Sequence, residues 1–111
     1  MKLPSVIRFA EADIKKAFYE LESGNSFERE LFKFINQAMD NLEEDAYCGI
    51  QIPKRLIPKI YLQKYHVTNL WKYDLPKGWR LIYTLKNEQV TVISVILEWL
   101  DHKEYERRFK Y

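Results

Sequence analysis

Arg80 stands among large apolar residues in the stretch LPKGWRLIY (75–83), where a β-strand would normally keep its charges at the ends. A guanidinium is always charged and contacts phosphate or carboxylate through parallel N–H donors. This one is therefore either neutralised by a neighbour or available to an anion. His102 supplies an imidazole, the side chain best suited to proton transfer near neutral pH, and Tyr105 would share its side of a helix. These residue types could bind a phosphate group and move protons beside it.

The positive charges are concentrated in the middle of the chain. Residues 1–50 contain 6 Lys/Arg and 10 Asp/Glu, residues 51–86 contain 8 and 1, and residues 87–111 contain 4 and 5. The cations of this basic block are Lys54, Arg55, Lys59, Lys64, Lys72, Lys77, Arg80 and Lys86. They alternate with tyrosine and tryptophan, which suits phosphate contacts combined with base stacking. The same composition fits a solvated basic face on a sheet equally well.

Length and composition predict one α+β domain, 1–111. The 111 residues are 47% apolar and 31% charged, the balance of a globular protein of ordinary domain size. No apolar run approaches the ~18 residues that cross a bilayer, and the N-terminus lacks an apolar signal segment, so a cytoplasmic location without membrane contact is expected. Cys48 is the one cysteine, which permits no internal disulfide and no cysteine–histidine metal site.

The first half of the chain predicts a strand and two helices. Val6 to Phe9 is β-prone, and apolar residues recur with helical spacing from about Glu11 to Glu22. Asn25, with Glu28 three residues later, is a candidate N-cap for a second helix. The apolar stripe of that helix consists of Leu31, Phe34, Ile35, Ala38 and Leu42. The two helices are expected to form an antiparallel hairpin.

The second half predicts an antiparallel meander. Residues 47–68 are expected to form an irregular basic loop, with one short helix or strand around Ile60 to Leu62. The strand-like runs are 70–75, 79–86 and 89–99, joined by turns at 76–78 and 86–88, and a helical turn or packed tail covers 101–109. The expected fold is an N-terminal helical hairpin on one face of an antiparallel sheet, with a short C-terminal helix.

Strand alternation assigns Arg80 to the sheet face opposite the helical hairpin. Trp71, Tyr73, Leu75, Trp79, Leu81, Tyr83 and Leu85 share the apolar face, and Lys72, Asp74, Arg80, Ile82, Thr84 and Lys86 share the second. A turn at 76–78 places Asp74 opposite Arg80. Neutralisation of Arg80 by Asp74 is therefore one interpretation, and binding of an external anion is the other.

Four segments resemble the C-terminal half of the RelE/ParE toxin superfamily. They are 69–75, 78–83, 90–95 and 102–105, and the two N-terminal helices match the family's order. The resemblance implies a RelE-like fold and the toxin of a type II toxin–antitoxin system. RelE-like members are metal-independent endoribonucleases that cut mRNA, commonly on the ribosome, whereas ParE-like members inhibit DNA gyrase. It further implies a cognate antitoxin, mRNA and ribosomal RNA as partners, and no cofactor.

The resemblance also implies roles for particular residues. Arg80 would hold the scissile phosphate, with Lys72 beside it. Tyr105 would act in proton transfer or base stacking, and His102 falls where some relatives have an imidazole. The remaining cations of the basic block would grip RNA: Lys54, Arg55, Lys59, Lys64, Lys77 and Lys86.

Two departures from the family pattern leave alternatives open. Asp74 stands where the ribonucleases often have a basic residue, and Ile96 to Leu100 lacks the second arginine that is common there. A ParE-like gyrase inhibitor, or a catalytically decayed member that only binds RNA or protein, is therefore the alternative interpretation.

Overall fold

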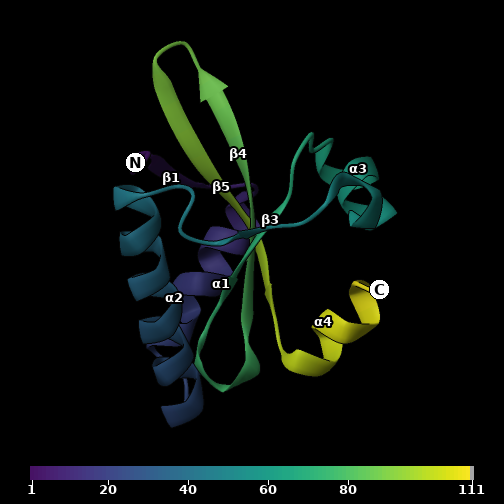
Figure 1. Ribbon diagram of the computed structural model, residues 1–111. Helices are drawn as coiled ribbons and strands as arrows, with labels where there is room; N and C mark the ends of the chain where they lie inside the picture. Colours follow the sequence, from purple (N-terminus) through teal and green to yellow (C-terminus); the bar gives the residue numbers. More distant parts are fainter. Residues whose placement is uncertain (111) are drawn as a thin grey trace.

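The computed structural model describes residues 1–110 and combines helices with one sheet (Figure 1). The elements are β1 (Val6–Phe9), α1 (Ala12–Glu22), α2 (Ser26–Glu44), β2 (Ile50–Gln51), α3 (Lys59–Tyr65), β3 (Trp71–Asp74), β4 (Arg80–Glu88), β5 (Thr91–Leu100) and α4 (His102–Arg108), with short 3₁₀ turns at Lys54–Leu56 and Pro76–Gly78. In this part of the chain no helix is long and apolar enough to cross a membrane.

The sheet has five strands in the order β1-β5-β4-β3-β2 and is mixed. Strands β3 to β5 form the expected antiparallel meander, and β2, in a segment expected to be irregular, adds a short antiparallel strand beside β3. Strand β1 runs parallel to β5, from the pair Val6↔Ile93 to Phe9↔Ile96. The expectation of a purely antiparallel sheet was therefore wrong. Because long connections separate β1 from β5, no tight turn forces these strands into opposite directions.

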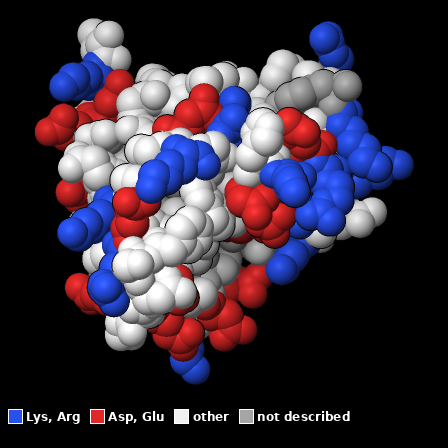
Figure 2. Space-filling model, turned by 90° about the horizontal axis from the view of Figure 1, so that it is seen from below, with Lys and Arg blue, Asp and Glu red and all other residues white. Residues whose placement is uncertain are grey.

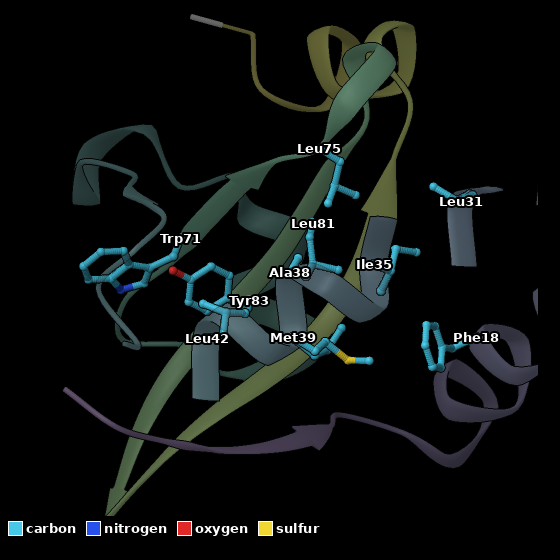
Figure 3. Packing of buried hydrophobic residues seen from close by; sticks show 11 residues of the cluster. Phe18, Leu31, Ile35, Ala38, Met39, Leu42, Trp71, Leu75, Leu81 and Tyr83 are labelled. Carbon is cyan, nitrogen blue, oxygen red and sulfur yellow. The ribbon is translucent and has the colours of Figure 1, made fainter. Parts of the chain in front are cut away.

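Helices cover both faces of the sheet, which corrects the expectation of a single covered face. In Figure 1, α1 and α2 lie on one side of the strands, and α3 and α4 lie on the other. The first core, between α1, α2 and the sheet, is shown in Figure 3 and includes Leu42, Leu81 and Tyr83. The second core includes Ile82 and Leu97, which are almost fully buried. These apolar side chains on the second face require a cover of their own.

The helical hairpin forms as its sequence predicts. Asn25 Oδ1 accepts a hydrogen bond from Glu28 N, and the Glu28 carboxylate accepts one from Asn25 N, so the predicted capping box is confirmed. The buried side of α2 consists of Leu31, Ile35, Ala38, Met39 and Leu42. Its apolar stripe therefore packs against the sheet, as amphipathic spacing requires.

The second half differs from expectation mainly at its turns. Of the short helix or strand expected around Ile60 to Leu62, the structure shows the helix, α3. The turn expected at 86–88 was wrong: β4 continues to Glu88, and Glu88 pairs with Thr91. The chain reverses at Gln89, whose φ is 54°, and Val90, which is fully exposed. The expected C-terminal helical turn is α4, capped by Asp101 and Glu104.

Candidate functional site

Lys72, Arg80 and Tyr105 meet on the second face of the sheet. Lys72 lies on β3, Arg80 begins β4, and Tyr105 lies on α4. The 3₁₀ turn between the strands brings the cations together, because Lys77 and Gly78 adopt φ values of 61° and 81° and reverse the chain sharply. Three of the four residues expected to be catalytic are thus in one cluster.

The Tyr105 ring forms the inner wall of this cluster. Arg80 Cζ and Lys72 Nζ each lie 5.2 Å from the ring centroid, a range in which a cation is attracted to an aromatic face. The Arg80 and Lys72 side chains are 18% and 17% exposed. Tyr105 is buried and stacks on Phe109 at 4.6 Å. The two cations are therefore held in fixed positions with only a small part of each reaching solvent.

Asp74 contacts both cations through one oxygen. Its Oδ1 lies 2.8 Å from Arg80 Nε and 3.2 Å from Lys72 Nζ. The register pairs Asp74 with Arg80 across β3 and β4, so the cross-strand ion pair expected from the sequence is present. The Asp74 side chain is 48% exposed. Two cations and one carboxylate leave the cluster with one surplus positive charge.

The Arg80 guanidinium is not fully hydrogen-bonded. Its Nε atom is buried and has no hydrogen-bond partner, although Asp74 Oδ1 is only 2.8 Å away, because the N–H does not point at that oxygen. Nη1 donates a long bond of 3.3 Å to the Trp79 carbonyl. A buried donor left without an acceptor costs about 1–3 kcal/mol. An acceptor that lies along the direction of the Nε–H bond would therefore bind favourably here.

His102, the fourth expected catalytic residue, has a different partner. Its Nε2 lies 2.6 Å from Glu106 Oε1, one turn along α4, and both side chains are more than half exposed. Its Cβ packs beside Gly78, where an added methyl group would approach it to 3.3 Å. The imidazole therefore lies at the rim, near the β3–β4 turn, and reaches solvent freely.

The other expected RNA-binding cations are spread over four segments. Lys54 and Arg55 lie in a 3₁₀ turn, Lys59 and Lys64 in α3, Lys77 in the β3–β4 turn and Lys86 in β4. Lys77 pairs with Glu30 of α2 at 2.6 Å, and Lys64 pairs with Glu11 at 3.8 Å. Lys77 thus reaches toward the helical hairpin, on the side of the sheet away from Arg80.

A second charged cluster was not predicted from the sequence. Arg108 Nη1 and the Tyr61 hydroxyl donate to the same oxygen, Glu98 Oε2, at 2.6 and 2.5 Å. Burial, reinforced by Glu98, raises the pKa of the Tyr61 hydroxyl well above its usual range. The cluster links α3, α4 and β5 on the face that also carries Arg80. Its signal in the sequence is Glu98, a charge inside an apolar strand.

Basic side chains also gather around α4, at the side of the molecule where the C-terminus lies (Figure 2). This helix carries Lys103, Arg107 and Arg108. The net charge of residues 87–111 did not reveal this group, because the acidic residues of β5 and α4 offset its positive charge. In space they stand together at one end of the second face.

Comparison with known proteins identifies no relative of this chain. No family model, curated protein or solved structure matches this chain. Among residues 1–110 no group of three or more histidine, cysteine or carboxylate side chains could hold a metal ion. The candidate site consists of two constrained cations, an aromatic wall, a half-exposed carboxylate and an imidazole at the rim.

Proposed function

We propose that this chain is the toxin of a type II toxin–antitoxin system, with a RelE-like fold and the activity of a metal-independent endoribonuclease acting on mRNA. One observation carries the proposal: Lys72 and Arg80 are held side by side against the Tyr105 ring, where a phosphodiester could reach both. The helical hairpin followed by antiparallel strands supports the same family.

The proposed reaction needs a phosphate clamp and proton transfer. The RNA 2′-oxygen attacks the neighbouring phosphorus and the 5′-oxygen leaves, which yields a cyclic phosphate and a free 5′-hydroxyl. Arg80 and Lys72 neutralise the charge that grows on the phosphoryl oxygens, a role worth about 10²–10³-fold for one preorganised donor. His102, exposed at the rim beside Glu106, accepts the 2′-proton and returns it to the leaving 5′-oxygen.

The proposed partners follow from charge. The cations of α3 and its preceding turn would contact RNA on the ribosome, in the cytoplasm. A cognate antitoxin with a flexible acidic segment would cover the second face and silence the toxin, because such a segment gains ion pairs on folding against cations.

Arg80 provides the decisive test. Arg80→Ala should abolish growth arrest and lower RNA cleavage by at least about 100-fold, and Arg80→Lys should restore little because lysine lacks the planar fork. Primer extension on transcripts after induced expression measures cleavage, and thermal unfolding checks that each variant is folded. Arg8→Ala, an exposed arginine on β1, is the matched control and should cut like the wild type. A folded Arg80→Ala protein that still cuts RNA would refute the proposal.

A second candidate is a member that binds without cleaving, either a ParE-like gyrase inhibitor or an RNA- or protein-binding domain. The observation in its favour is Asp74, whose carboxylate already contacts both cations. The same induction experiment separates the candidates. Intact transcripts with a DNA-damage response indicate gyrase inhibition, and salt-sensitive binding without turnover indicates a binding domain.

A further inference from the structure

Asp74 occupies the position that an external anion would take between the two cations. Its Oδ1 contacts both Arg80 Nε and Lys72 Nζ. This oxygen accepts a hydrogen bond from Lys72 Nζ but not from the Arg80 Nε–H. A tetrahedral phosphate presents several oxygens and can contact both cations at once.

The unsatisfied Arg80 donor shows independently that Asp74 is a poor partner. The Nε–H is buried and not hydrogen-bonded, although the carboxylate oxygen is within 2.8 Å. The strand register fixes the direction from which Asp74 approaches, since the two residues are paired across β3 and β4. An anion that enters from solvent is not bound by this register and can align with the N–H.

The Asp74 side chain has room to leave. It is 48% exposed, and partly exposed ion pairs are weak because water competes for both charges. A carboxylate that leaves the two cations can therefore turn into solvent.

We infer that Asp74 is a displaceable internal ligand of the Lys72–Arg80 pair, and that a phosphodiester of RNA binds by driving the Asp74 side chain out. The inference rests on the proposed RNA substrate but concerns binding rather than cleavage. Asp74 then lowers the affinity for RNA and selects ligands whose phosphate reaches both cations.

Asp74→Asn tests the inference, because it keeps the side-chain size and removes the competing charge. The probe is a single-stranded oligoribonucleotide with 2′-O-methyl groups, which cannot be cleaved because the nucleophile is blocked. Fluorescence anisotropy should show binding about 5- to 10-fold tighter than for the wild type. The slope of log K against log salt should stay nearly the same, because the phosphate contacts both cations in either protein.

Two controls separate displacement from a general charge effect. Glu88→Gln removes the same charge at the exposed end of β4 and should change affinity by less than about twofold. In an Arg80→Gln background, Asp74→Asn should bring no gain, because the pair that Asp74 blocks is then incomplete. Unchanged affinity in Asp74→Asn, or an equal gain without Arg80, would overturn the inference.

A measurement on the wild-type protein covers the case in which Asp74→Asn does not fold. The NMR resonance of the Arg80 Nε–H should shift when inorganic phosphate is titrated, because the phosphate becomes its acceptor. A resonance that stays in place at saturating phosphate would contradict displacement.

Failure of the inference and failure of the proposed function have different signatures. A gain in binding by Asp74→Asn, with no cleavage by any variant, retains the anion site and rejects the nuclease. Cleavage that depends on Arg80, with no gain in binding by Asp74→Asn, retains the nuclease and rejects displacement.

Discussion

Glu98 shows how a single charged residue can join three elements of this fold. Its Oε2 accepts hydrogen bonds from Tyr61 on α3 and Arg108 on α4, while Glu98 itself lies on β5. Only about a third of the Arg108 and Glu98 side chains reaches solvent. Partial burial strengthens such bonds and also makes the loss of one partner costly, because the remaining groups cannot return fully to water.

We therefore expect Glu98→Gln to lower the free energy of unfolding by about 1–3 kcal/mol, since Arg108 keeps its charge and loses its counter-ion. Urea denaturation measures the change. Glu106→Gln is the matched control, because Glu106 also pairs with a residue of α4 but is 64% exposed. It should cost less than about 1 kcal/mol. Equal losses in the two variants would contradict this view of the cluster.

At the scale of elements, the helices depend on different sources of stability. Each of α3 and α4 has seven residues, and helices this short are not stable alone in water. They are held by burial of Tyr61 and Tyr105 in the second core. By contrast, α2 has 19 residues and its own capping box. Its C-terminal end is also tied to the chain terminus through Asp45.

Asp45 makes the attachment of the N-terminus dependent on pH. Its Oδ1 accepts hydrogen bonds from Leu3 N at 3.1 Å and Tyr47 N at 3.0 Å, which lower the pKa of the carboxyl below its usual 3.8. A lowered pKa in the folded state means that the contribution is present above about pH 4 and is lost as the pH falls through the folded pKa.

Asp45→Asn should therefore lower the melting temperature at pH 7, and the difference from the wild type should shrink as the pH falls below about 4 and through the folded pKa of the carboxyl. Thermal unfolding followed by circular dichroism across this range measures it. Asp40→Asn, which removes a carboxylate at an exposed position of α2, is the matched control. A constant offset between Asp45→Asn and the wild type would show that ionisation is not involved.

For the whole molecule, two cores share one sheet. Residues of β4 and β5 alternate between them, so that Leu81 and Ile96 belong to the first core and Ile82 and Leu97 to the second. Both cores therefore pack against the same central strands, on opposite faces of the sheet. Loss of packing in either core should therefore weaken the fold as one unit rather than release half of it.

Leu42→Ala in the first core and Leu97→Ala in the second should each destabilise the protein by about 2–5 kcal/mol, because both side chains are almost fully buried. Denaturation curves recorded by circular dichroism and by tryptophan fluorescence should coincide for each variant. Val90→Ala at the exposed β4–β5 turn should change little. Separate transitions for the two probes would show that the cores unfold independently.

Local patterns were enough to determine several features from the sequence. Helical spacing with Asn25 and Glu28 defined α2, and alternation along β3 and β4 placed Arg80 and Lys72 on the same face, opposite the helical hairpin. The Asp74–Arg80 pair followed from the length of the turn. Each of these depends on residues a few positions apart, where geometry is set by backbone periodicity.

Only tertiary structure decided what covers the second face. The parallel pairing of β1 with β5, the packing of α3 and α4, and the bond of Tyr61 to Glu98 join residues far apart in the chain. The periodicity of the sequence does not identify such partners, because the position of a short helix is set by the apolar surface against which it packs. The contact of the Arg80 guanidinium with the Tyr105 ring, which forms one wall of the candidate anion site, arises from that packing.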